Sequence, residues 1–406
     1  MITPSYSPTA TERVLPRMAL DFTTGVLDPR VTVARLLNTA TRFNASGLVE
    51  IVNANLPRFD YDSFTLAPKG LLIEETRANL LLYSDQLNVA SWGKTASVTA
   101  DQLVSPDGTT NADLVSTTGN FQYVRQSITA TANAAYTQSF FVKPVSGSTT
   151  VRILLTNGPQ TEAAGSNFSL TGAGSLGTLF QVGTGVLTGR SITRLANGWY
   201  LCTISGTVNT TTLFGYIDNH SNGTMSFGAW GAQLEAGAFA TSYIPTTTTS
   251  LTRNADTVSM TGTNFSDWYN QTSGTFVIDA DSYTIGSADY PLTASDGTSN
   301  NRFGFYRTAA NIAGYVTTGA VDQMYLTRGS ITANTPYKAA VAAIANSGNV
   351  ALNGTAAAGD ASLTMPTLNR LSIGNNNSAG FMSGHMRKIA YYSPRLLNAE
   401  LQAFSK

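Results

Sequence analysis

The chain carries few residues of the kinds that bind metals. Its two histidines, His220 and His385, are far apart in the sequence, and it has a single cysteine. A zinc site of the usual kind needs a cluster of Cys and His ligands, which this sequence lacks. Turns rich in Asp and Asn at 218–223 and 295–301 offer oxygen ligands for calcium, but without the EF-hand spacing. We therefore expect no cofactor, with calcium left open beside the alternative that these residues only shape turns.

Two patterns resemble enzyme motifs, and each lacks a required part. Gly172, Gly174 and Gly177 match Gly-x-Gly-x-x-Gly, but no helical pattern follows and no acidic residue stands about 20 positions on, as dinucleotide binding requires. Asp279 and Asp281 are two positions apart and so share one face of an expected strand. Glycoside hydrolases use a pair of carboxylates, but the Glu-x-Asp-x-x-Glu pattern is absent. We expect no catalytic activity, and keep glycan cleavage as an alternative.

Aromatic side chains beside polar turns are the remaining candidates for chemistry. Their rings stack on sugars, while neighbouring amides and carboxylates bind the hydroxyl groups. The candidates along the chain are Trp92, Tyr123, Trp199, Tyr216, Trp230, Trp268, Tyr269, Tyr306, Tyr315 and Tyr325. Tyr216, Asp218, Asn219 and His220 lie together at a polar loop, and we predict a surface site for glycan there.

Most other aromatic and thiol positions are expected in a core. Trp199 and Trp230 lie within strand-like apolar patterns, which favour burial over binding. Cys202 sits in the apolar stretch WYLCTI, so we predict a buried structural thiol and no nucleophile.

The segment Pro68–Ser84, PKGLLIEETRANLLLYS, combines two apolar runs with a cluster of charges. Residues 71–73 indicate one short buried strand, and 80–83 indicate a second. Between them, the carboxylates at 74–75 and Arg77 suit a partly buried ion pair at a junction. The alternative is a solvated turn, in which exposed pairs contribute little.

Composition indicates β-structure, and the charges show no pattern typical of binding to nucleic acid or to anionic membranes. Charged residues make up 12% and the formal net charge is +0, so solubility depends on Thr, Ser, Asn and Gly. This mixture, with 17 Tyr and 18 Phe, is typical of strands joined by turns. The absence of a basic block predicts no nucleic-acid partner. No window approaches the ~20 apolar residues of a membrane helix, and no secretory signal is visible. We expect synthesis in the cytoplasm and no membrane insertion.

The chain is expected to have three regions and an all-β fold. Residues 1–84 show short, interrupted strands without a core of their own. Residues 85–250 and 251–406 each show short alternating strands with turn signals, which predict two jelly-roll β-sandwiches. The alanine-rich stretch PYKAAVAAI is expected in a hairpin, because strand patterns and an Asn-Ser-Gly-Asn turn flank it. Asn398 as N-cap and Glu400 in the first turn predict a short C-terminal helix.

The first region holds apolar residues that it cannot bury alone. Segments of this size need partners to complete a core, so we expect a homo-oligomer. Attachment and oligomerisation are assigned to Phe22, Phe59, Leu71, Leu72, Ile73 and Arg77.

Two blocks, PRFDYDSFTLAPKGLLIEETRANLLLYSDQ and GAQLEAGAFATSYIPT, resemble a recurrent arrangement in tailed-phage proteins of the head-spike and tail-fibre type. In that family a similar block precedes a jelly roll like those of carbohydrate-binding modules. The resemblance covers about residues 19–250. The last strand and helix, GHMRKIAYYSPRLLNAELQAF, resemble the end of concanavalin-A-like or laminin-G-like domains.

The resemblance implies a structural protein on the virion surface that displays lectin-like domains for host-surface glycan. It further implies a trimer that attaches to other virion proteins through its N-terminal region. The alternatives are a decoration or cement protein without a ligand and, because the concanavalin-A-like fold also carries glucanases, a glycan-cleaving enzyme. The balanced charge removes long-range steering, so we expect a neutral or weakly acidic glycan.

Overall fold

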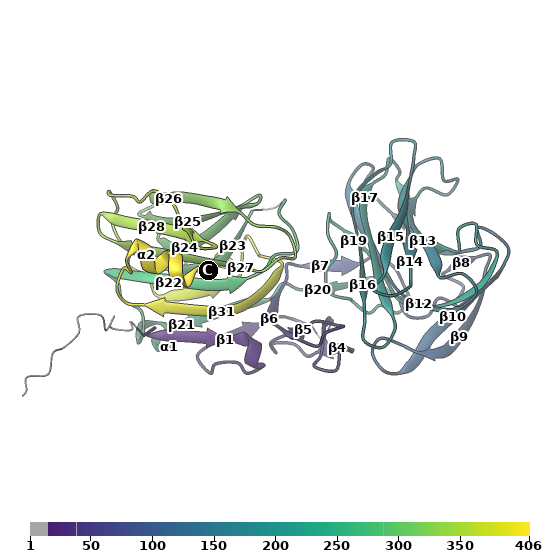
Figure 1. The fold of residues 1–406 in the computed structure, drawn as a ribbon, viewed down its shortest axis with the longest axis horizontal. Helices are drawn as coiled ribbons and strands as arrows, with labels where there is room; N and C mark the ends of the chain where they lie inside the picture. The colour runs from purple at the N-terminus through teal and green to yellow at the C-terminus, as the bar shows by residue number, and fades with distance from the viewer. Residues whose placement is uncertain (1–14, 38, 287) are drawn as a thin grey trace, which may run out of the picture.

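The computed structural model describes residues 15–37, 39–286 and 288–406, which form two β-sandwiches lying side by side (Figure 1). Strands make up nearly all of the regular structure in these ranges, and a short helix ends the chain. The expected all-β class with two sandwiches is confirmed. Among the described residues, no helix is long and apolar enough to cross a membrane.

The first sandwich consists of two antiparallel sheets. One sheet has the order β16 (Val186–Arg194), β17 (Tyr200–Thr207), β12 (Ala135–Ser146), β19 (Thr224–Ala236), β10 (Thr110–Thr118) and β9 (Ser97–Val104). The other has the order β15 (Ser175–Val182), β14 (Ala163–Ser169), β13 (Thr150–Thr156), β18 (Thr212–Asp218), β11 (Tyr123–Thr129) and β8 (Gly93–Lys94).

Alternating side chains of these strands fill the space between the two sheets. Phe140 and Val142 of β12 meet Ile153 and Leu155 of β13 in one buried cluster, because successive side chains of a strand point to opposite faces. Cys202 belongs to the same cluster, and burial raises the pKa of its thiol, so the expected structural thiol is confirmed.

The opposite face of the first sheet carries a second apolar cluster. Trp199 and Trp230 are buried there, as expected, together with Phe141 and Tyr243. Val49 of β4 (Val49–Val52) joins them, so this cluster attaches the N-terminal region to the first sandwich.

The second sandwich pairs strands from both ends of the described chain. One sheet has the order β29 (Thr355–Ala356), β28 (Ser347–Leu352), β27 (Tyr337–Ile344), β22 (Ser273–Ala280), β31 (Gly384–Tyr392), β6 (Pro68–Ile73) and β5 (Phe59–Tyr61), and β1 (Met18–Asp21) also pairs with β31. The other has the order β2 (Thr32–Ala34), β21 (Thr257–Thr261), β30 (Arg370–Ile373), β23 (Asp289–Ser295), β24 (Arg302–Thr308), β25 (Asn311–Thr318) and β26 (Val321–Ser330). The alanine-rich stretch is β27 of the expected hairpin.

The strands β1, β2, β5 and β6 of the N-terminal region are therefore part of the second sandwich, which differs from the expectation of a separate unit. Phe22 of the turn η1 (Phe22–Thr24), Phe59, Leu71 and Ile73 lie in the core of that sandwich, and Leu72 is buried as well. The reason for expecting an oligomer was wrong, because these side chains find their partners within the same chain.

Two small sheets connect the sandwiches. The strands β7 (Arg77–Asn79) and β20 (Leu251–Arg253) pair with each other, as do β3 (Ala40–Phe43) and β4. Figure 1 shows β4 to β7 and β20 between the two sandwiches.

Two short helices belong to the second sandwich. The helix α1 (Thr263–Ser266) follows β21, and α2 (Asn398–Phe404) ends the chain. The N-cap of α2 is Leu397, one residue before the position predicted, because the side-chain oxygen of Asn398 accepts a hydrogen bond from Arg395 at 2.6 Å. Glu400 lies in the first turn as expected, and its carboxylate accepts the backbone N–H of Leu397 at 2.6 Å.

Candidate functional site

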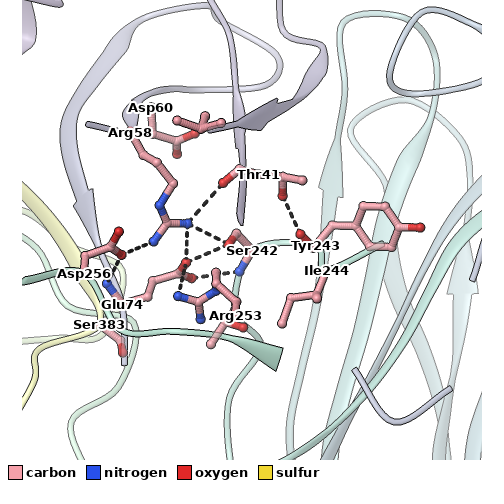
Figure 2. Close-up of polar contacts among 12 residues, drawn as sticks. Thr41, Arg58, Asp60, Glu74, Ser242, Tyr243, Ile244, Arg253, Asp256 and Ser383 are labelled. Carbon is pink, nitrogen blue, oxygen red and sulfur yellow. Dashed lines mark hydrogen bonds and ion pairs between the residues drawn. The ribbon is translucent and has the colours of Figure 1, made fainter. Parts of the chain in front are cut away.

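A buried ionic network lies where the N-terminal region meets both sandwiches (Figure 2). Arg58, just before β5, donates hydrogen bonds to the carboxylate of Glu74 at 2.6 Å and to the hydroxyl of Ser242 at 2.8 Å. Its other terminal nitrogen binds the carboxylate of Asp256. Arg253, at the end of β20, lies 3.2 Å from the same oxygen of Glu74. Arg58 and Glu74 belong to the N-terminal region, whereas Arg253 and Asp256 belong to one short segment that follows the first sandwich, with Asp256 182 positions after Glu74.

Further contacts extend this junction to β2. Arg35 donates to Asp256 at 2.8 Å, and the backbone N–H of Glu74 donates to the same carboxylate at 3.0 Å. Ser242 completes the shell of Glu74, since its N–H and its hydroxyl each donate to the carboxylate at 2.7 Å. Buried charges are tolerated when they are paired and hydrogen-bonded in this way.

The network fixes the charge state of its central acid. Burial by itself would raise the pKa of Glu74, but the charges of Arg253 and Arg58 and the hydrogen bonds from Ser242 lower it to about 2. Glu74 is therefore an anion throughout the physiological pH range. Burial lowers the pKa of Arg253, and the charge of Glu74 opposes part of that decrease. This arrangement positions the two sandwiches, and it holds the carboxylates of Glu74 and Asp256 in ion pairs.

The ion pair expected in the segment 68–84 is present. Arg77 and Glu75 are paired at 2.5 Å, and the Arg77 guanidinium stacks on the ring of Phe239 with 4.7 Å to its centroid. Arg77 thus contacts the linker that leaves the first sandwich, within the chain. Its predicted role in attachment to another chain has no separate support in these contacts.

A second charged cluster joins the sheet edge at β5 to β22 and β31. His385 is fully buried, with Nδ1 lying 2.9 Å from Asp281 and Nε2 lying 3.0 Å from Asp60. Burial would lower the pKa of His385, but the charge of Asp281 and the hydrogen bonds to both carboxylates raise it. Arg387 lies 3.2 Å from Asp281 on the other side. The expected pair Asp279 and Asp281 is thereby divided, since Asp281 is committed to His385.

The predicted glycan site at 216–220 is not a surface site in this structure. Tyr216 is 1% exposed, and Asp218 and Asn219 are fully buried. Asp218 is paired with Arg152 at 2.5 Å, and the Asn219 side chain donates to the carbonyl of Gly223 within the turn and to that of Gly119 in a neighbouring loop. Only His220 is partly exposed. The polar turn was read correctly, but its amide and carboxylate face inward to hold the turn and are not available to a ligand.

A row of tyrosines on the outer side of one sheet of the second sandwich forms an aromatic surface that is exposed in part, unlike residues 216–220 of the first sandwich. We call Tyr290, Tyr306, Tyr315 and Tyr325 the tyrosine face. They lie on the four consecutive strands β23 to β26, with centroid distances of 4.8 Å for Tyr290–Tyr306 and 6.1 Å for Tyr306–Tyr325. Phe303 and Phe305 of β24 point into the core. Because successive side chains of a strand point to opposite faces, Tyr306 points outward.

Arg302 completes the tyrosine face. Its guanidinium lies 5.7 Å from the ring centroid of Tyr290 and 5.4 Å from that of Tyr315, and it donates to the Tyr290 hydroxyl at 3.2 Å. Tyr315 is almost buried and binds Thr293 at 2.9 Å, whereas Tyr325 is 46% exposed. The rings contact one another in tilted and edge-on pairs, and these contacts hold them in place, so that little side-chain entropy remains to be lost on binding.

The sequence named three of these four tyrosines as candidates and missed Tyr290 and Arg302. Neither Trp268 nor Tyr269, the other candidates there, is available, since both are buried against Tyr391. The alternation of β24 predicts Tyr306 outward, but only the strand order shows that the rings are neighbours.

Within residues 15–37, 39–286 and 288–406, no group of three or more His, Cys, Asp or Glu side chains is arranged to hold a metal ion. The calcium alternative therefore has no support from a carboxylate cluster in these ranges.

The comparisons with known proteins give no family. No protein-family model matches the chain, and no curated protein matches it. Among solved structures, a Ruminococcus gnavus IT-sialidase CBM40 bound to alpha2,3 sialyllactose is 17% identical, with a TM-score of 0.30, over 34% of this chain and 84% of that one. NanB sialidase from Streptococcus pneumoniae, as a K499G mutant, is 12% identical with a TM-score of 0.31, over 36% of this chain and 26% of that one.

A botulinum neurotoxin structure is similar at the same level. It belongs to botulinum neurotoxin type C, whose cell entry is dependent upon interaction with two ganglioside molecules. The two chains are 8% identical with a TM-score of 0.30, over 38% of this chain and 41% of that one. This chain spans less than half of the neurotoxin and NanB chains. At these scores the likeness carries no argument about the ligand of this chain, and the argument below depends on its own residues.

Proposed function

We propose that this protein binds hydroxyl-rich surface glycans, without cleaving them, through the tyrosine face. The observation that supports this most strongly is the ordered row of Tyr290, Tyr306 and Tyr325 beside Arg302. Aromatic rings offer apolar surface to the C–H groups of a sugar ring, and tyrosine hydroxyls and a guanidinium offer hydrogen bonds to its hydroxyl groups.

The shape of this surface predicts weak binding at a single site. The rings lie on the outer side of a sheet and would contact a ligand from one side. Each contact therefore buries a limited area. We expect a dissociation constant in the millimolar to micromolar range, roughly 4–8 kcal/mol. Several copies held together would increase the apparent affinity by about 10²–10⁴ through avidity.

The finer part of the proposal is a role as a spike or fibre on a phage virion. It is supported by the two sequence blocks that resemble head-spike and tail-fibre proteins. A trimer and attachment to other virion proteins through the N-terminal region belong to this proposal. Part of that region, residues 1–14, lies outside the described residues. Light scattering of the full-length protein tests the oligomer, and a monomeric mass would contradict it.

The absence of catalysis is also a proposal. It is supported by the ion pairs of Asp281, whose carboxylate contacts His385 and Arg387. The pKa of Asp281 is lowered by these partners, so its carboxyl stays ionised and is unsuited to act as the general acid that cleavage of a glycosidic bond requires.

A glycan array tests the function. We expect the full-length protein to bind a subset of bacterial surface glycans, and Tyr306→Ala and Tyr325→Ala to reduce binding about tenfold each. Tyr325→Phe, which keeps the ring, and Tyr123→Ala on the first sandwich are the matched controls and are expected to retain binding. No binding to any glycan would favour the cement protein, and shortening of a bound glycan would favour the enzyme.

A further inference from the structure

A cleft of about 400 Å³ lies beside the junction, on the side of the molecule shared by both sandwiches. This volume is within the range of about 300–1,000 Å³ that is typical of small-ligand sites. One wall is the outer face of β12, β16 and β17. A second wall is the N-terminal region with Asp60 and Lys69, and a third is formed by Tyr283 and Asn334 of the second sandwich.

The floor of the cleft is made of hydroxyl groups on three neighbouring strands. Ser139, Thr203 and Ser191 are cross-strand neighbours, and Ser205 lies one step further along β17. Ser139 and Thr203 are hydrogen-bonded to each other at 3.2 Å. A pair of hydroxyls bound to each other still has one O–H donor and several lone pairs left over. The floor therefore presents donors and acceptors of the kind that match sugar hydroxyls.

The cleft is lined by the carboxylates of Asp60 and Asp62 and by the cations Arg42, Lys69 and Arg190. One oxygen of Asp60 accepts the backbone N–H of Phe43 at 2.7 Å, and the other lies 3.0 Å from His385. Asp62 accepts the backbone N–H groups of Phe64 and Thr65. Both carboxylates therefore already accept hydrogen bonds within the chain.

Lys69 is a cation of the cleft with donors left over. Its ammonium has three donors, and its nearest carboxylate oxygen, on Asp60, is 4.0 Å away. The same ammonium lies 5.9 Å from the ring centroid of Tyr283. A sugar ring against Tyr283 would therefore have a cationic donor beside it and the hydroxyl floor within the same cleft.

We infer that this cleft is a second glycan site, which binds a short segment of an uncharged oligosaccharide between the two sandwiches. The inference rests on the proposed glycan-binding function, but on different residues from the tyrosine face. Uncharged sugars fit because the floor consists of neutral hydroxyls, Arg42 is paired with Glu50, and Arg190 donates to the Ser166 hydroxyl and the Gly177 carbonyl. A ligand here contacts three separate parts of the chain, so binding also stabilises the arrangement of the two sandwiches.

The test measures binding of short uncharged oligosaccharides, namely glucans, galactans, mannans and N-acetylglucosamine chains, to the full-length protein by calorimetry. Ser191→Trp fills the cleft from its exposed rim on the edge strand β16. Thr178→Trp, exposed on β15, is the matched control because it lies outside the cleft. Lys69→Met keeps the apolar stem beside Tyr283 but removes the donors, and we expect it to weaken binding about 10- to 100-fold.

The stoichiometry separates this inference from the tyrosine face. We expect two sites per chain in the wild type, one in Ser191→Trp, one in Tyr306→Ala/Tyr325→Ala, and none when all three changes are combined. We also expect the oligosaccharide to raise the unfolding temperature less in Ser191→Trp than in Thr178→Trp.

Two results would overturn the cleft site. If Ser191→Trp and Lys69→Met bind as the wild type does, the cleft holds no sugar, whatever the tyrosine face does. If Tyr306→Ala/Tyr325→Ala removes all binding, the proposed function stands but the cleft is excluded. If instead only Ser191→Trp and Lys69→Met lose binding, the cleft is supported and the tyrosine face is excluded.

Discussion

Asp60 and His385, which are 325 positions apart in the sequence, meet at 3.0 Å between a carboxylate oxygen and ring Nε2. Asp60 belongs to β5 at the edge of the sheet, and His385 to β31 near its middle. With Asp281 on its other nitrogen, His385 can donate to both carboxylates only as an imidazolium. The imidazolium therefore holds the N-terminal region on the second sandwich.

This contact predicts a loss of stability at alkaline pH. Other groups that face the cluster are Tyr283, whose hydroxyl is 3.4 Å from Nε2, and the cations Lys69 and Arg387. The pKa of His385 is raised in the folded state, so its contribution is fully present below the unfolded value of 6.5 and is lost as the pH rises through the folded value. The free energy of unfolding, from urea titrations, should fall above pH 6.5.

The control for this prediction is His385→Gln, which removes the titrating group. The variant should be less stable than the wild type at pH 6, and it should lack the decline at higher pH. A parallel decline in the two proteins would assign the effect to other groups.

The buried network predicts the opposite limit at acidic pH. Glu74 has a folded pKa of about 2 against an ordinary value of 4.5, so its contribution is present above 4.5 and is lost as the pH falls towards 2. That difference corresponds to on the order of 3 kcal/mol. The variant Glu74→Gln should lack this acid-dependent loss when the free energy of unfolding is measured between pH 5 and 2. Its unfolding should take up about one proton fewer than unfolding of the wild type.

Removing a cation from the same network should be costly at all pH values. Arg58→Met leaves Glu74 and Asp256 partly uncompensated, and we expect a loss of about 3–5 kcal/mol in the free energy of unfolding. Arg30→Met is the matched control, because the ion pair of Arg30 with Asp28 is partly exposed and such pairs contribute about 0–1 kcal/mol. Equal losses in the two variants would show that burial does not increase the contribution of the ion pairs to the free energy of unfolding.

The sequence predicted the classes of structure well and the partners of the N-terminal region poorly. Alternation along single strands predicted both sandwiches, the alanine-rich hairpin and the buried Cys202. These features depend on neighbours within a few residues. By contrast, β1 and β6 pair with β31, more than 300 residues away, and no local pattern specifies that pairing.

The candidate sites show the same division. A polar turn at 218–223 was recognised, but the inward direction of Asp218 depends on Arg152 of another strand. The ionic network gave one usable signal in advance: in a chain with 12% charged residues, Arg58, Glu74 and Arg253 adjoin apolar strands. Charges in such places must find partners, although the sequence does not say which.

The pairing of the N-terminal strands predicts how fragments behave. A fragment that begins at residue 251 lacks β1, β2, β5 and β6, and with them Phe22, Leu71 and Ile73 of its core. We expect it to be insoluble or to lack cooperative thermal unfolding. Addition of a separate peptide that spans residues 15–79 should restore folding, measured by circular dichroism. A fragment 251–406 that unfolds cooperatively by itself would contradict this prediction.

The tyrosine face finally predicts how binding responds to salt. Its rings and hydroxyls are uncharged, and the one cation, Arg302, is held by Tyr290 and Tyr315. Interactions between exposed charges are screened over about 8 Å at physiological ionic strength, whereas stacking and neutral hydrogen bonds are not. Adsorption of the purified protein to host cells should therefore change less than about twofold between 50 mM and 300 mM NaCl. Arg302→Gln should leave the salt response unchanged, while Tyr325→Ala should lower adsorption at every salt concentration. A steep decrease with salt in the wild type would show that charged groups dominate recognition, and would exclude a neutral glycan as the main ligand.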